Sequence, residues 1–299
     1  MKYSESNKPI VCMQKNSTCY KGTTTMVPKG VLWHSTGANN PNIRRYVQPL
    51  ETDKNYQEMI ALLGKNKYGN DWNHKARQAG MNCWIGKLAD GSVATVQTMP
   101  WNYKPWGCGS GSKGSLNNTH MQFEICEDDL NSKAYFDAVY KEACEITAYY
   151  CKMYNLNPLG TFVYNGVTVP VITTHDESYD LKLGSNHGDP TKWLKKYGKT
   201  MDDARRDVAA LMNGKAETSK PAPAAKANTI GVRTLREGDK GEDVKALQIL
   251  LTGWGCKANA DGIFGPKTGD AVEKFQKKFG LVQDRIAGIK TWSKALGVK

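Results

Sequence analysis

The first two thirds of the chain alternate between short apolar runs and stretches with helical spacing. Three bulky apolar residues at 31–33 follow a Pro-Lys-Gly turn and predict a short buried strand that ends at His34. Across residues 121–125, Met, Phe and Ile alternate with Gln and Glu. This alternation predicts a half-buried strand with Glu124 on its polar side.

Helical periodicity is clearest in three segments of this region. Apolar residues recur with a spacing of three or four at 56–63, 132–154 and 200–212, and each spacing predicts one helix. Asp-Gly at 90–91 and Asn-Gly at 165–166 lie between apolar arms and predict hairpins. Strands that alternate with helices indicate an α/β domain with a mixed central sheet flanked by helices.

The pattern stops at residues 214–229, which lack bulky apolar residues and contain the only Pro-Ala tract. This composition is typical of a linker, so we expect domains at 1–213 and 230–299. The second domain contains an internal sequence repeat, because the segment 284–291 resembles the segment 261–268, which lies 23 residues earlier. Three short amphipathic stripes there predict a small all-α domain of three helices.

The charge composition indicates which kinds of partner the protein could bind. The 299 residues carry 41 Lys and Arg against 29 Asp and Glu, a formal net charge of +12 that favours anionic partners. The basic residues form no dense run, so we expect no nucleic-acid partner.

Eight cysteines without a CxxC pair exclude zinc-finger spacing, and we expect free thiols. No stretch has a signal-peptide pattern or the length of a membrane span, so we expect synthesis in a cytoplasm and no membrane partner.

Candidate chemistry concentrates between residues 173 and 193. This stretch holds His175 and His187, and Asp189 follows two residues after the second histidine. If the backbone is extended there, His187 and Asp189 point to the same side. A histidine, a carboxylate and a distant histidine such as His34 would form a three-ligand zinc site with an open fourth position, which is typical of catalytic zinc. On spacing alone, a polar loop with hydrogen-bonded histidines remains an alternative.

Two segments of the chain contain longer motifs that resemble those of known protein families. Residues 230–299, with GDKGEDVKALQ, DGIFGPKTGDAVEKFQ and IAGIKTW, resemble the peptidoglycan-binding three-helix domain of wall hydrolases. Residues 1–213 resemble the zinc-dependent N-acetylmuramoyl-L-alanine amidases of the bacteriophage-lysin and peptidoglycan-recognition type. The motifs are LWHSTG at 32–37, HMQFEICE at 120–127, and TTHDES with SNHGDPTKW within 173–193.

The resemblance implies roles for five residues. The zinc ligands of the family fall on His34, His175 and Asp189, and its catalytic glutamate falls on Glu124. His187 takes the place of a basic residue two before the third ligand and would stabilise the oxyanion. A direct zinc-ligand role for His187 in place of Asp189 stays open, as does a solvated strand face for Glu124. The implied reaction is hydrolysis, by zinc-activated water, of the amide between N-acetylmuramic acid and L-alanine.

The resemblance also implies partners and a setting. We expect a monomer that acts on bacterial peptidoglycan and on anionic wall polymers, made in a host cytoplasm as a phage endolysin and released to the wall at lysis. A bacterial autolysin, a zinc peptidase that cuts the stem peptide and a binding-only relative are the alternatives. Met81-Asn82 and Gly107 depart from the family pattern at positions of substrate contact, and neither departure touches a metal ligand.

Overall fold

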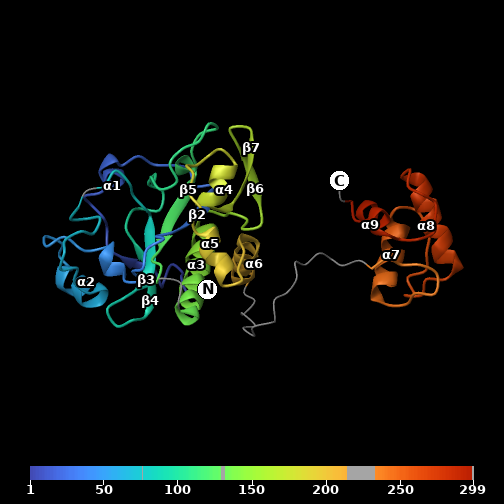
Figure 1. Ribbon diagram of the computed structural model, residues 1–299, viewed down its shortest axis with the longest axis horizontal. Helices are drawn as coiled ribbons and strands as arrows, with labels where there is room; N and C mark the ends of the chain where they lie inside the picture. The colour runs from blue at the N-terminus through green and yellow to red at the C-terminus, as the bar shows by residue number, and fades with distance from the viewer. Residues whose placement is uncertain (76, 129–131, 214–232, 298–299) are drawn as a thin grey trace. The chain divides into compact units, whose positions relative to one another are not determined.

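The structure, a computed structural model, describes residues 1–75, 77–128, 132–213 and 233–297 (Figure 1). The chain divides into two compact units, Met1–Ser219 and Lys220–Lys299, and each unit is described by itself. The segment expected to be a linker, 214–229, lies outside the described residues. None of the eight cysteines, all of which are described, forms a disulfide, as the sequence predicted.

The first unit is built on a six-stranded mixed sheet in the order β1-β4-β3-β5-β2-β8. The strands are β1 (Ile10–Val11), β2 (Gly30–Ser35), β3 (Cys83–Lys87), β4 (Val93–Gln97), β5 (His120–Ile125) and β8 (Ile172–Thr174). Within this sheet β3 and β4 pair antiparallel, whereas the other neighbours are parallel. A separate hairpin consists of β6 (Thr161–Tyr164) and β7 (Val167–Pro170). The predicted mixed sheet is therefore confirmed.

Helices flank this sheet, and α3 packs across β2, β3 and β4 with α6 beside it (Figure 1). The helices are α1 (Thr18–Gly22), α2 (Tyr56–Leu63), α3 (Lys133–Met153), α4 (His175–Asp180), α5 (Thr191–Lys196) and α6 (Met201–Met212), with 3-10 turns η1 (Ile43–Arg45) and η2 (Leu116–Asn118). The side chains of Ser132 and Thr200 cap α3 and α6. The three predicted helices are confirmed as α2, α3 and α6. Among the described residues, no helix is both long and apolar enough to cross a membrane.

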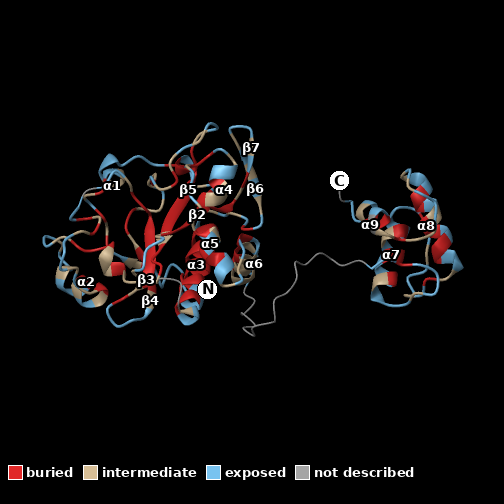
Figure 2. Ribbon diagram, in the orientation of Figure 1, coloured by how far each residue is buried: buried red, intermediate tan, exposed pale blue. Residues whose placement is uncertain are grey.

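The central strands are buried on both faces (Figure 2). On the α3 side Trp33 packs on Phe123, with ring centroids 5.3 Å apart. The predicted half-buried character of 121–125 is wrong, because Gln122 on the opposite face is 0% exposed. A parallel strand in the middle of a sheet is usually covered on both sides. Here the side chain of Asn117 contacts Gln122 on the face away from α3.

The connection into β8 leaves the β6–β7 hairpin before the main sheet begins. The strand β7 ends at Pro170, which has no N–H to continue a ladder. The carbonyl of Val171 then accepts a hydrogen bond from the Val31 N–H, and Ile172 pairs with Val31 in the main sheet. The chain thus changes sheets before it reaches residue 175.

The second unit contains α7 (Glu242–Gly253), α8 (Pro266–Lys278) and α9 (Ile289–Ala295) around its own core, which confirms the predicted three-helix domain. The sequence repeat is also a structural repeat. The amide Nε2 of Gln248 donates to the side chains of Asp261 and Thr268, and that of Gln276 donates in the same way to Asp284 and Thr291. Each loop is therefore tied to the helix before it by one buried glutamine.

Candidate metal centre

Three neighbouring parallel strands, β5, β2 and β8, bring the candidate residues together at their carboxyl ends. His34 on β2 lies in register with Glu124 on β5. His175 is the first residue of α4, directly after β8, and Thr174 caps that helix in a capping box with Glu177. The strand ends and the cap hold these side chains on rigid backbone, at the edge where open α/β sheets usually bind ligands.

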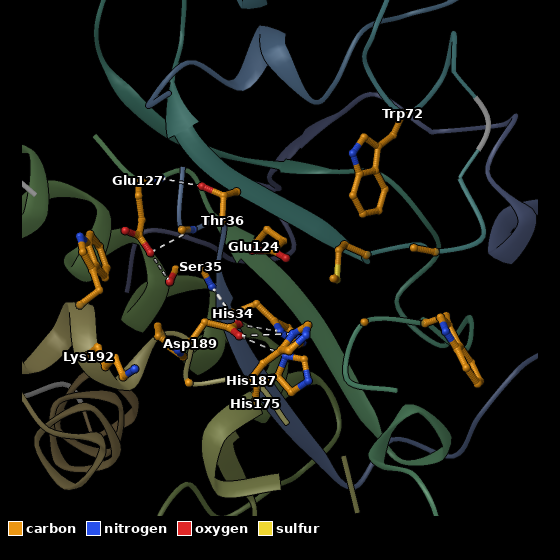
Figure 3. Close-up of a pocket in the computed structure, with 18 residues that line it drawn as sticks. His34, Ser35, Thr36, Trp72, Glu124, Glu127, His175, His187, Asp189 and Lys192 are labelled. Atoms are coloured by element: carbon orange, nitrogen blue, oxygen red, sulfur yellow. Dashed lines mark hydrogen bonds and ion pairs between the residues drawn. The ribbon is translucent and has the colours of Figure 1, made fainter. Parts of the chain in front are cut away.

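The loop that follows α4 adds a carboxylate between the two histidines (Figure 3). Asp189 Oδ2 lies 3.1 Å from His34 Nδ1, and Asp189 Oδ1 lies 3.2 Å from His175 Nδ1. One ligand atom from each of these three residues lies within 4.8 Å of the others. Both histidines are 1% exposed. Two imidazole nitrogens and one carboxylate oxygen that converge in this way fit a three-ligand metal site.

The charge state of Asp189 suits a ligand. Burial raises its pKa, but hydrogen bonds with His175 and His34, and the charges on both rings, lower it by more. The net pKa lies well below the ordinary value for an aspartate. The carboxylate is therefore ionised at neutral pH, the form that binds a cation.

His187 faces the same cavity from a loop. The residues directly before Asp189 form no strand. The His187 ring nevertheless packs on His175, with centroids 4.5 Å apart, and its Nδ1 lies 4.0 Å from Asp189 Oδ1. Its side chain is 64% exposed, in contrast to the buried His34 and His175.

Glu124 has the most unusual environment of these side chains. Its Oε2 atom is buried and has no hydrogen-bond partner among the described residues. Burial raises the pKa of Glu124 well above its ordinary value, and the charges of Asp189 and Glu127 add to the shift. Glu124 as a residue is half-buried, but this oxygen atom is enclosed and does not lie on a solvated strand face. Because buried polar atoms are almost always paired, an unpaired carboxylate oxygen in a cavity wall is a candidate for proton transfer.

These residues line a cavity of about 680 Å³. In Figure 3, Glu127 and Lys192 lie on one side of the metal-site residues and Trp72 lies on the other. Glu127 is 7% exposed and accepts hydrogen bonds from the Ser35 hydroxyl and the Gly37 N–H. Sequence reasoning assigned it no role, although it ends the quoted motif HMQFEICE. Trp72 lies in a segment without any motif.

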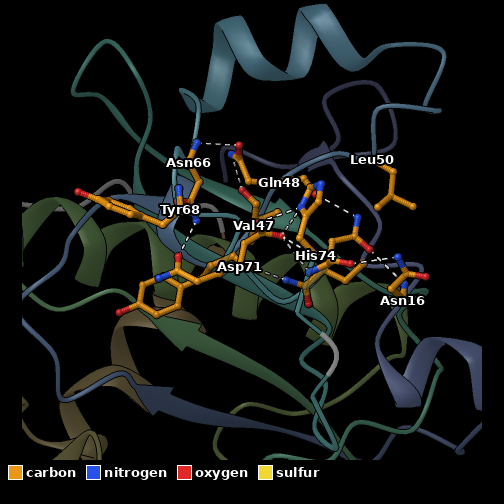
Figure 4. Close-up of polar contacts among 12 residues, drawn as sticks. Asn16, Val47, Gln48, Leu50, Asn66, Tyr68, Asp71 and His74 are labelled. Carbon is orange, nitrogen blue, oxygen red and sulfur yellow. Dashed lines mark hydrogen bonds and ion pairs between the residues drawn. The ribbon is translucent and has the colours of Figure 1, made fainter.

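A polar network that includes Asp71 and His74 (Figure 4) holds the loop in which Trp72 lies. The buried Asp71 carboxylate lies 3.0 Å from His74 Nδ1, and His74 Nε2 lies 3.3 Å from Glu51 Oε2. Between Asp71 and His74 in the chain, Trp72 packs edge-on against Trp84 at 4.9 Å. Two carboxylates around one imidazole thus anchor one wall of the cavity.

This anchor should make stability depend on pH. Burial lowers the pKa of His74, but hydrogen bonds to Asp71 and Glu51 and their charges raise it to a net value above the ordinary one. A pKa higher in the folded than in the unfolded state stabilises the fold fully below the unfolded pKa, near 6.5. That stability is lost as pH rises through the folded value. We expect His74→Gln to lower the free energy of unfolding in urea more at pH 6 than at pH 9. An equal loss at both pH values would contradict this interpretation.

Comparison with known proteins agrees with both units. The sequence profile of the family described as "N-acetylmuramoyl-L-alanine amidase" matches residues 24–192. The profile described as "Putative peptidoglycan binding domain" matches residues 240–294. The first match includes all five candidate site residues, and the second includes the three helices of the C-terminal unit apart from the last residue of α9.

Individual relatives each match part of the chain. A "Probable N-acetylmuramoyl-L-alanine amidase" from Bacillus licheniformis is 29% identical over 182 residues, 60% of this chain and 46% of that protein. The amidase CwlA of Bacillus subtilis is 27% identical over 204 residues, 63% of this chain and 71% of that protein. The structure of the Staphylococcus aureus hydrolase AmiA with its ligand is 18% identical, with a TM-score of 0.41 over 71% of this chain and 83% of that one. The chain therefore spans about half the length of the first of these relatives. Because the amidase profile covers more than half of its residues, the chain belongs to the N-acetylmuramoyl-L-alanine amidase family and carries a putative peptidoglycan binding domain.

Proposed function

We propose that the protein is a zinc-dependent cell-wall hydrolase that cleaves the amide between N-acetylmuramic acid and L-alanine in peptidoglycan. The observation that carries the proposal is the convergence of His34, His175 and Asp189 beside the unpaired Glu124 carboxylate. Family membership and the peptidoglycan binding domain support peptidoglycan as the substrate. The phage-endolysin setting stays a prediction from the sequence.

The donor set favours zinc over other common cations. Two imidazoles and one carboxylate match the ligands of catalytic zinc, whereas calcium and magnesium prefer sites built of oxygen atoms alone. Zinc bound there supplies Lewis acidity, which lowers the pKa of water toward 7 and polarises a carbonyl. The burial of His34 and His175 keeps these ligands in one geometry.

Glu124 performs the proton transfers in this proposal. Its raised pKa makes the carboxylate a stronger base than an exposed glutamate, so it takes a proton from the attacking water. The protonated side chain then delivers that proton to the leaving amine of L-alanine. His187 lies on the same cavity and donates a hydrogen bond to the oxyanion, a contribution of roughly 3 kcal/mol in other hydrolases.

Digestion of purified cell walls tests the bond that is cut. The full-length protein should release new amino-terminal alanine without a parallel increase in reducing sugar. New amino termini of other stem-peptide residues would identify a peptidase instead, and new reducing ends would identify a glycosidase. Either result would overturn the proposed function.

The C-terminal unit acts by tethering in this proposal, with 230–299 as a domain that folds alone. It has its own core and carries 13 basic against 8 acidic residues, a net charge of +5. Tethering raises the local concentration of the first unit at the wall without adding a contact at the scissile bond. Binding through charge alone would weaken steeply with salt, whereas recognition of sugar and peptide would persist.

Two fragments test this role. Residues 1–213 should cleave soluble muropeptides at nearly the full-length rate and lose most activity on intact walls. Residues 230–299 should sediment with walls, and rising salt should reduce that binding only in part. If 230–299 stays in the supernatant at every ionic strength, the tethering role is wrong.

A further inference from the structure

We propose that one hydrogen-bond network, anchored on the loop 106–114, determines which nitrogen of each metal-site histidine carries a proton when a metal ion is bound. Asn117 and Gln122 act on His34, and Ser185 acts on His175. All of them are positioning residues, since they act through the histidines and not on a substrate. The inference rests on the proposed metal site and goes beyond it by assigning these further residues.

The orientation of the Asn117 side chain is determined by backbone groups. Its Oδ1 accepts hydrogen bonds from the N–H groups of Gly107, at 3.1 Å, and Cys108, at 3.3 Å. Its Nδ2 donates to the carbonyl of Gly109 at 2.9 Å. Backbone N–H groups only donate and carbonyls only accept, so a flipped amide would lose all three hydrogen bonds.

Asn117 in turn orients Gln122. The Gln122 Nε2 donates to Asn117 Oδ1 at 2.9 Å, which leaves Gln122 Oε1 to face His34 Nε2 at 2.9 Å. A carbonyl oxygen can only accept, so His34 Nε2 must carry a hydrogen. Nδ1, the nitrogen that faces the Asp189 carboxylate, is then the one that would give up its proton and offer a lone pair to a metal ion.

A second series of hydrogen bonds reaches His175 through Ser185. The Ser185 hydroxyl donates to the carbonyl of Cys108 at 3.2 Å, and the Ser185 N–H donates to the same carbonyl at 2.7 Å. With its single proton used in this way, the hydroxyl can only accept from His175 Nε2 at 3.0 Å. His175 therefore also holds a proton on Nε2, and Nδ1, which faces Asp189, is the nitrogen that would bind a metal ion.

The two series of hydrogen bonds meet at Cys108. Its N–H donates to Asn117, and its carbonyl accepts from Ser185. Cys108, Asn117 and Gln122 are all 0% exposed, so water does not compete for these hydrogen bonds. The loop can approach so closely because it is rich in glycine. A Cβ on Gly107 would lie 2.4 Å from Gln122 Oε1.

The consequence for metal binding follows from the chemistry of imidazole. A neutral ring has one nitrogen with a lone pair, and only that nitrogen binds a metal. Without the Gln122 carbonyl, the Asp189 carboxylate beside Nδ1 would be the remaining acceptor and would favour the tautomer of His34 with its proton on Nδ1, which metal binding would have to reverse. Loss of such outer partners typically weakens metal affinity by about 10- to 100-fold.

Zinc affinity of full-length variants is the first test. Gln122→Met keeps the length of the side chain and removes the acceptor, and Ser185→Ala removes the hydroxyl. We expect each variant to bind zinc about 10- to 100-fold more weakly in competition with a chromogenic chelator. Asn118→Ala is the matched control, because Asn118 adjoins Asn117 but bonds to Tyr164 outside the network. It should bind zinc as the unchanged protein does.

Imidazole ¹⁵N NMR of the zinc-loaded protein separates positioning from a structural effect. The unchanged protein should show slowly exchanging protons on Nε2 of both His34 and His175. Gln122→Met should lose slow exchange at His34 alone, and Ser185→Ala at His175 alone. Protons on Nδ1 in the unchanged protein, or normal zinc affinity in both variants, would overturn the proposal. If Gln122→Met fails to fold, Ser185→Ala and the unchanged protein still decide.

Neither readout measures amide hydrolysis. Failure of the proposed function would appear as a lack of new alanine termini on digested walls, whatever the zinc affinities are. Failure of the network would leave hydrolysis intact and the variants' zinc affinities unchanged.

Discussion

Glu124→Gln should lower kcat on soluble muropeptides by about 100-fold or more while zinc remains bound. Glutamine keeps the size of the side chain but cannot take a proton from water. The unpaired and buried Oε2 is the structural reason to expect so large an effect from one atom. Turnover and the zinc content of the same preparation check both halves of this prediction.

Glu127→Gln provides the matched control. Glu127 is a second buried carboxylate on the same cavity, but the Ser35 hydroxyl and the Gly37 N–H already occupy one of its oxygens. We therefore expect a smaller loss of kcat than for Glu124→Gln. Full activity in Glu124→Gln would place the base elsewhere.

His34→Ala or His175→Ala should abolish both zinc binding and turnover. Each substitution removes one of three protein ligands and leaves a gap at a buried position of the site. Metal analysis of the purified protein should fall from about one zinc per chain to nearly none.

His74→Ala controls for the removal of any partly buried histidine. His74 belongs to the loop anchor of Asp71 and Glu51 and not to the metal site. Zinc content should stay near one per chain in this variant. Turnover by a zinc-free His34→Ala protein would refute the assigned metal site.

Local patterns predicted the elements that carry the site. The apolar run before His34 predicted a strand, and the strand extends one residue past that histidine. The apolar spacing at 132–154 and 200–212 predicted the helices α3 and α6. The grouping of His34 with His175 and Asp189 came from the family resemblance, because spacing along the chain alone left a polar loop as an alternative.

Other parts of the site depend on contacts between distant residues. Gln122 is buried because Asn117 and Cys108 cover it. The alternation of residues 121–125 gives no sign of these contacts, because both partners lie outside that segment. Likewise, Trp72 lines the cavity in a loop where Asp71 and Glu51 hold His74, two residues further along the chain. Hydrogen bonds between polar side chains have no sequence period, so only the fold reveals them.

Zinc titration of the metal-free full-length protein, with new alanine termini on a defined muropeptide as the readout, tests the central claim most directly. We predict no release without metal and a rise that saturates at about one zinc per chain. Undiminished release of alanine termini by the metal-free protein would contradict the account, as would zinc-dependent cleavage at any other bond.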